Sequence, residues 1–211
     1  KKYPRFIQTL IHKNKLIDVV ENEVVGLNIK NKKIIGVFLA DNKKISCSGV
    51  VVACGTFVNG LIHTGSKTFS AGRFGEKNVK DISFHLKKVG HSSLRLKTGT
   101  PPRINLKSID LSLCEPALGD LDFFPFSITT NKNKKIKNIP CYIVNTNKKA
   151  HNIIEKNLAL SAMFSGKIKG VGPRYCPSIE DKVFRFKERE SHQLFLEPEW
   201  EGSNQIYING F

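Results

Sequence analysis

The chain lacks the features that mark membrane proteins and disulfide-rich secreted proteins. No apolar run in its 211 residues approaches the roughly 18 residues that a membrane-spanning helix needs. Its first residues lead into no apolar signal-peptide core. Its five cysteines are odd in number and form no C-x-x-C pair, which argues against a disulfide scaffold and a zinc ribbon. We therefore expect a cytoplasmic protein that does not enter a membrane.

Common motifs of nucleotide-binding and hydrolytic enzymes are also missing. The chain has no G-x-G-x-x-G, so it lacks the usual pyrophosphate-binding turn of a dinucleotide-binding domain. It has no H-E-x-x-H, G-x-S-x-G or Walker loop. Its six histidines are scattered without the spacing of metal ligands. The sequence therefore predicts no metal site.

Acidic residues are few relative to basic ones. The chain has 18 Asp and Glu against 34 Lys and Arg, a net charge of +16. Such a charge favours a polyanionic partner, and nucleic acid before membrane because no basic amphipathic helix stands out. A second interpretation, an AT-biased genome that uses lysine freely, stays open. The Gly- and Pro-rich loops around Arg73, Lys97 and Arg103 hold cations suited to phosphate contacts.

Hydrophobic periodicity predicts an α/β chain. Helices are expected at residues 4–12, 78–89, 146–158 and from residue 178 onward. Strands are expected at residues 16–20, 24–29, 34–39, 94–97, 140–145, 193–197 and 205–208. The continuous apolar run at 49–56 is typical of a buried strand in a parallel sheet, and the glycine that ends it lets a ligand approach the backbone.

Cys176 is the leading candidate nucleophile. It lies in the stretch 172–182, just before a helix start that Ser178 and Asp181 mark with a capping-box pattern. A helix N-terminus and nearby cations, here Arg174 and Lys182, favour the reactive thiolate. A buried, unreactive cysteine is the alternative, since free cysteines often pack as small hydrophobic residues.

Three longer stretches carry a resemblance to a known family. They are residues 54–65 (CGTFVNGLIHTG), 95–104 (RLKTGTPPRI) and 170–182 (GVGPRYCPSIEDK). Their order and spacing resemble the GidA/MnmG family, the tRNA uridine 5-carboxymethylaminomethyl modification enzymes. The resemblance continues into residues 192–199 (HQLFLEPE) and extends over nearly the whole chain.

The resemblance implies a fold and an activity. Members of that family are longer two-lobed flavoproteins, so this chain resembles a middle portion. Residues 1–97 and 171–211 would form part of a Rossmann-like FAD-binding domain of the glutathione-reductase type, and 98–170 an inserted α/β subdomain. The implied enzyme is a homodimer that uses FAD, NADH and methylene-tetrahydrofolate to modify wobble uridine 34 of tRNA. It works with an MnmE-type GTPase.

The resemblance also implies site residues. Cys176 and Lys182 would be catalytic. Contacts to FAD or NADH are implied for Val24, Gly55, Thr56, Gly172, Pro173, Arg174, Tyr175, Ser178, Glu180, Asp181 and Phe186. From their charge and their place in loops, we also expect Arg73, Lys97 and Arg103 to contact tRNA phosphates. Two alternatives remain: a folate- and FAD-dependent tRNA uridine methyltransferase, which the 172–182 motif disfavours, and a basic RNA-binding module without catalysis.

Overall fold

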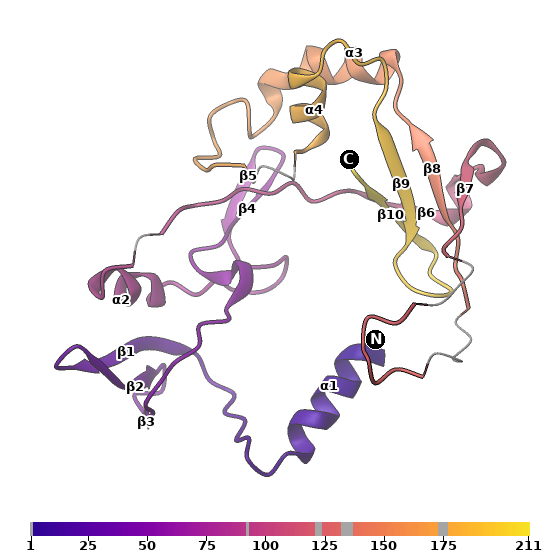
Figure 1. Cartoon of the computed structure of the whole chain (residues 1–211). Coiled ribbons are helices and arrows are strands. Elements are labelled where there is room, and N and C mark those ends of the chain that lie inside the picture. Colours follow the sequence, from indigo (N-terminus) through magenta and orange to yellow (C-terminus); the bar gives the residue numbers. More distant parts are fainter. Residues whose placement is uncertain (1, 92, 121–123, 132–136, 173–176) are drawn as a thin grey trace. The chain divides into compact units, whose positions relative to one another are not determined.

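The computed structural model describes residues 2–91, 93–120, 124–131, 137–172 and 177–211. It divides into two compact units, Lys1–Ser93 and Leu94–Phe211 (Figure 1). Both units contain helices and strands, so the predicted α/β class is confirmed. Among the described residues, no helix has the length and apolar character needed to cross a membrane.

A three-stranded antiparallel sheet forms part of the first unit. Its strands are β1 (Val24–Lys30), β2 (Lys33–Leu39) and β3 (Lys44–Ser46), paired in chain order. Asn31 and Lys32 form the turn between β1 and β2: both residues have positive φ, as a tight two-residue hairpin with a matching twist requires.

Helix α2 (Ile82–Lys88) packs on β1. A Cβ added at Gly26 would lie 2.7 Å from His85 Nε2, so a side chain at this position would displace the His85 ring. Val37, Leu39 and Ile82 are buried and form the small core of this part.

The rest of the first unit is irregular. Helix α1 (Lys2–Lys13) buries none of its residues, although its sequence is amphipathic. Strands β4 (Leu61–Thr64) and β5 (Lys67–Ser70) form a separate hairpin, and a short 3₁₀ turn, η1, spans Gly55–Phe57.

Two predicted strands of the first unit are wrong. Residues 16–20 and 49–56 form no strand, and Leu16 and Val51 are 94% and 92% exposed. A strand needs a neighbour for its backbone hydrogen bonds, and no described residue pairs with either segment. Apolar composition alone could not reveal that missing neighbour.

A five-stranded antiparallel sheet organises the second unit. Its order is β6-β10-β9-β8-β7. The strands are β6 (Arg103–Asn105), β7 (Glu115–Ala117), β8 (Cys141–Asn145), β9 (Gln193–Pro198) and β10 (Gln205–Asn209). Pro116 lies in the edge strand β7, where a missing N–H donor is tolerated. The parallel sheet of a Rossmann-like domain is not found among the described residues, where the named strands pair only antiparallel.

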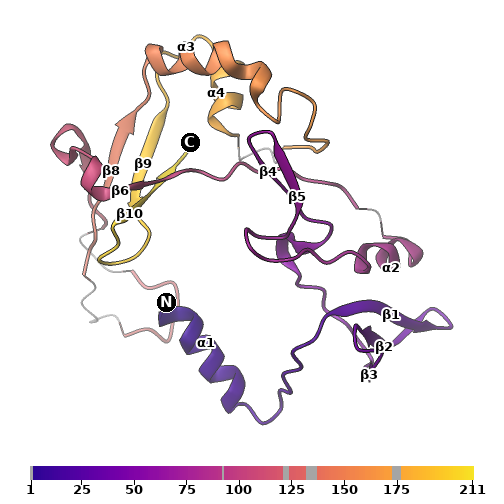
Figure 2. The ribbon, with the colours of Figure 1, turned by 180° about the vertical axis from the view of Figure 1, so that it is seen from behind.

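Two helices accompany this sheet. Helix α3 (Lys148–Asn157) follows β8, and α4 (Ile179–Arg185) precedes β9 (Figure 2). The helix expected at 146–158 begins at Lys148, and the side chain of Asn147 caps it by accepting from the Ala150 N–H. The buried apolar residues of this unit are Ile179, Val183, Leu194, Leu196 and Ile206.

The sheet joins segments that the sequence analysis placed in different domains. Strands β6, β7 and β8 come from residues 98–170, and β9 and β10 come from 171–211. The assignment of 98–170 as a subdomain inserted into an FAD domain stays a prediction.

Candidate functional site

The predicted site residues fall into two groups, one in each unit. Residues 172–186 and the loop cations Lys97 and Arg103 belong to the second unit, and the remaining predicted contacts to the first. Pro173, Arg174, Tyr175 and Cys176 lie outside the described residues. The structure therefore describes the chain on either side of the candidate nucleophile Cys176, up to Gly172 and from Pro177 onward.

Helix α4 begins where the sequence predicts. Ser178 is its N-cap with extended backbone angles, φ −70° and ψ 168°. The capping hydrogen bond is not made, and Ser178 Oγ is buried with no hydrogen-bond partner among the described residues. Glu180 and Asp181 lie in the first turn, where negative charge stabilises the helix dipole. The buried side chains of Ile179 and Val183 pack the helix against the core.

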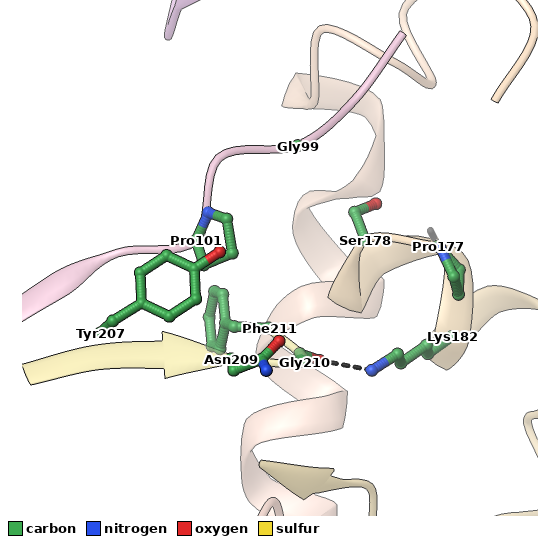
Figure 3. A pocket seen from close by; sticks show the side chains of 9 residues that line it. All are labelled: Gly99, Pro101, Pro177, Ser178, Lys182, Tyr207, Asn209, Gly210 and Phe211. Atoms are coloured by element: carbon green, nitrogen blue, oxygen red, sulfur yellow. Dashed lines mark hydrogen bonds between the residues drawn. The ribbon is translucent and has the colours of Figure 1, made fainter. Parts of the chain in front are cut away.

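A cavity of about 190 Å³ lies beside the start of α4 (Figure 3). It combines the aromatic ring of Tyr207, the amide of Asn209 and the ammonium of Lys182, and its other lining residues are Gly99, Pro101, Pro177, Ser178, Gly210 and Phe211. Its volume is below the roughly 300 Å³ at which typical small-molecule pockets begin. The cavity suits a single ring or another small group with polar edges.

Lys182 is fixed at the edge of this cavity. Its Nζ donates a hydrogen bond to the carbonyl oxygen of Gly210, just past the end of β10 (Figure 3). That bond ties α4 to β10 and directs the ammonium along the cavity rather than into bulk solvent. Of the two predicted catalytic residues, Lys182 is the one that the structure describes.

Two further residues predicted from 172–186 lie on α4 or at its end. Glu180 accepts a hydrogen bond from Ser161 Oγ at 3.4 Å. Phe186 ends the helix, and the guanidinium carbon of Arg189 lies 5.4 Å from its ring centroid. Neither residue lines the cavity, so a role in cofactor binding stays a prediction for both.

Lys97 and Asp181 form a buried ion pair. The distance from Lys97 Nζ to Asp181 Oδ2 is 3.0 Å, and each side chain is 11% exposed. Lys97 Nζ also contacts Met163 Sδ. A Cβ added at Gly172 would lie 2.9 Å from Lys97 Cε, so the lysine side chain lies directly over that glycine. No signal in the sequence joins positions 84 residues apart, and the sequence analysis missed this pair.

Arg103 is held by a network around Tyr207. Its Nε lies 2.6 Å from Glu199 Oε1, and its guanidinium carbon lies 4.8 Å from the Tyr207 ring centroid. Its Nη1 also donates to the Pro101 carbonyl at 3.2 Å. The cation therefore orients an aromatic residue of the cavity, and its predicted contact with tRNA stays a prediction.

The cavity residues of β10 carry a signal that the sequence analysis did not use. Alternate residues of a strand share a face. Ile206 is buried in the core, so Tyr207 and Asn209 face the other side together. Strand alternation alone could have nominated these two residues.

The first unit holds the other predicted group. A cavity of about 290 Å³ is lined mostly by apolar side chains; its lining residues are Asn22, Glu23, Val24, Val37, Val50, Val51, Val52, Ala53, Cys54, Val79 and Ile82. Val24 lines this cavity. Gly55 comes directly after the lining residue Cys54 and has φ +55°, a conformation that favours glycine. The next residue, Thr56, donates from Oγ1 to the Gly72 carbonyl at 3.1 Å.

Arg73 lies in the loop that follows β5. It pairs with Glu76, and the Arg73 side chain is 72% exposed. An exposed pair of this kind leaves the guanidinium accessible to a phosphate. Its predicted tRNA contact stays a prediction.

A buried histidine pair near α4 also escaped the sequence analysis. The ring centroids of His151 and His192 are 5.1 Å apart. Thr146 Oγ1 lies 2.7 Å from His151 Nε2 and accepts from the His192 N–H at 2.8 Å. Burial lowers the pKa of His192, and His151 and Lys182 lower it further. The described residues contain no cluster of three or more potential metal ligands.

Comparison with known proteins supplies the family. The model of the family described as Glucose inhibited division protein A matches residues 1–211. Relatives named tRNA uridine 5-carboxymethylaminomethyl modification enzyme MnmG are 45% identical in Karelsulcia muelleri and 44% identical in Thermodesulfovibrio yellowstonii, each over 210 residues. These matches cover 100% and 99% of this chain but 34% and 33% of the relatives. The chain thus spans about a third of the length of the curated relatives it matches.

Solved structures agree with this result. Aquifex aeolicus GidA in its form I crystal has a TM-score of 0.88 and 38% identity, over 100% of this chain and 36% of that one. The form II crystal of the same protein has a TM-score of 0.85 and 34% identity, over 99% of this chain and 33% of that one. Since the family model matches every residue and the fold agrees with solved relatives, the chain belongs to the GidA family.

Proposed function

We propose that the protein containing this chain adds a carboxymethylaminomethyl or aminomethyl group to C5 of wobble uridine 34 in tRNA. The observation that carries the proposal is the match of residues 1–211 to a family whose relatives are named for this modification. Because the chain spans about a third of those relatives, the activity belongs to the whole protein, and we expect this chain alone to be inactive.

FAD fits the first unit in part. The cavity around Val24 and Val50–Val52 is apolar and suits one face of a flat ring system. The chain's own residues lack the G-x-G-x-x-G turn that holds a pyrophosphate. We propose that Val24, Gly55 and Thr56 contact the flavin, which supplies redox chemistry, and that residues outside this chain hold its phosphates.

The second unit suits the reductant. Its cavity has room for a ring such as nicotinamide but not for a whole dinucleotide. Lys182, Ser178 and Asn209 offer polar groups along its edge. We propose that residues 172–186 receive NADH and that Cys176 and Lys182 act in the chemistry at uridine. Methylene-tetrahydrofolate is the proposed one-carbon donor.

The net charge of +16 supports a tRNA substrate, since Lys and Arg on a protein surface attract phosphates. Arg73 and Arg103 remain the proposed phosphate contacts in the two units. We propose further that the whole protein acts in the cytoplasm as a homodimer with an MnmE-type GTPase.

The test is reconstitution with the full-length protein. Unmodified tRNA is incubated with the protein, the GTPase and GTP, FAD, NADH, methylene-tetrahydrofolate and glycine or ammonium, and its nucleosides are analysed by mass spectrometry. We expect the C5 modification at uridine 34, lost on omission of NADH or folate.

A matched pair of cysteine variants locates the chemistry. Cys176→Ser should abolish modification, while Cys114→Ser, at a half-buried cysteine away from both cavities, should retain it. A product carrying only a methyl group would support the methyltransferase alternative. Binding of tRNA without any product would support a non-catalytic RNA-binding module.

A further inference from the structure

The ion pair of Lys97 and Asp181 differs from the other ion pairs of the described residues. In each of the others, at least one side chain is 41% exposed or more. In this pair both are 11% exposed. A buried pair is a weak source of stability because both charges lose their hydration, so this pair points to a specific structural task.

Lys97 fixes the chain just before residues 173–176. The Lys97 N–H donates to the Val171 carbonyl at 3.1 Å, and the Val171 N–H donates to the Arg95 carbonyl at 3.1 Å. These two bonds form a parallel bridge between Leu96 and Val171. The Lys97 side chain then covers Gly172, where any Cβ would collide with it.

The same short segment also reaches the chain just after residues 173–176. Asp181 lies in the first turn of α4, and the N–H of the next residue, Lys182, donates to the Ser178 carbonyl at 3.0 Å. A Cβ added at Gly99 would lie 3.5 Å from Ser178 Cβ. Residues 95–99 therefore contact both flanks of the segment that carries Cys176.

We propose that Lys97 and Asp181 are positioning residues. Their ion pair joins Gly172 to the first turn of α4 and so sets the separation of the two ends of the Cys176 segment. The inference rests on the proposed role of Cys176. It assigns Lys97 and Asp181 to this task in place of tRNA and cofactor contacts, because each charge is already compensated by the other in a buried setting.

The experiment uses the full-length enzyme and four variants. Lys97→Met and Asp181→Asn each break the pair and leave one charge. The double variant Lys97→Met/Asp181→Asn breaks it without changing the net charge. Arg185→Met is the matched control, because Arg185 is the exposed, more distant partner of Asp181 at 3.6 Å.

The main readout is the rate of Cys176 alkylation by iodoacetamide across pH, measured by peptide mass spectrometry. We expect both single variants and the double variant to shift the alkylation profile by about one pH unit, a tenfold change in thiolate at a given pH. Arg185→Met should leave it in place. A profile restored in the double variant would overturn the proposal, because it would mean that charge alone acts on the thiol.

Two parallel readouts test the competing roles. If Lys97→Met lowers the salt dependence of tRNA binding by about one ion and leaves the alkylation profile unchanged, Lys97 contacts a phosphate and the proposal fails. If Asp181→Asn weakens NADH binding while Lys97→Met has no effect on alkylation, Asp181 contacts the cofactor and the proposal again fails.

Folding is followed by flavin content and melting temperature. The double variant is the one expected to fold best, since it leaves no uncompensated buried charge. Failure of the proposed function is separable: a fully active Cys176→Ser enzyme would refute the catalytic role of Cys176, while alkylation of Cys176 in the other variants would still report on the ion pair.

Discussion

The two units differ in how the elements around their buried apolar residues are organised. The second unit has a five-stranded sheet with two helices, and its core includes Val183 and Ile206, at 1% and 2% exposure. The first unit buries few residues beneath α2 and leaves α1 and the 49–54 run exposed.

That difference separates two kinds of candidate site. In the second unit, α4, β10 and the loop that contains Gly99 and Pro101 line a cavity with both polar and apolar groups. In the first unit, the apolar cavity is lined partly by Val51, whose side chain no described residue covers. Exposed apolar surface of this kind marks an interaction surface.

The largest expected contrast is in the packing of the two units. Ile206→Ala should destabilise the second unit by about 2–5 kcal/mol, because it leaves a cavity in a closed core. Leu16→Ala in the first unit should cost less than about 0.5 kcal/mol if that residue stays exposed. Hydrogen exchange of peptides from each unit in the full-length protein measures both. A large loss for Leu16→Ala would show that another part of the protein buries it.

Helix caps provide a second, smaller contrast within the second unit. Asn147→Ala should cost about 1 kcal/mol, because it removes the hydrogen bond that caps α3. Ser178→Ala should change the stability by less than about 0.5 kcal/mol, because its hydroxyl makes no cap bond. The melting temperatures of the two variants measure these stability changes. Equal decreases in melting temperature would mean that the Ser178 side chain does cap α4.

The smallest expected effect is a pH dependence specific to the second unit. The pKa of His192 is lowered from 6.5 by burial, so the unfolded chain binds its proton more readily than the folded one. Its contribution to stability is therefore fully present above pH 6.5 and is lost as the pH falls below that value. The melting temperature of His192→Phe should change less with pH in this range than that of the wild type. The exposed-site variant His12→Gln should keep the wild-type dependence of melting temperature on pH. If His192→Phe also kept it, His192 would not be its cause.

Local patterns predicted much of the fold. The β1–β2 hairpin, α4 and strands β8, β9 and β10 follow from alternation, turn residues and helix-start signals close in sequence. The strand predicted at 49–56 failed because pairing depends on a neighbour that the local sequence does not specify. The capping hydrogen bond expected at Ser178 is not formed, because its hydroxyl is buried without a partner among the described residues.

The candidate site was predicted in part. Lys182 lines one cavity and Val24 another, and the catalytic and cofactor roles expected for them stay predictions. The Lys97–Asp181 pair and the Thr146–His151–His192 contacts join distant positions, and a single sequence carries no signal for them. The basic composition pointed to Lys97 as a phosphate contact. It could not show that Asp181 already compensates the charge of Lys97.

The proposed roles of the two units, flavin contact in the first and NADH binding in the second, are tested most directly by flavin reduction in the full-length enzyme. Lys182→Met should keep the bound FAD but slow its reduction by NADH in stopped-flow measurements, while the exposed control Lys187→Met should behave as wild type. Val24→Glu, which places a carboxylate in the apolar cavity of the first unit, should instead lower FAD content. Loss of FAD from Lys182→Met, with normal reduction of the flavin that remains, would contradict the account.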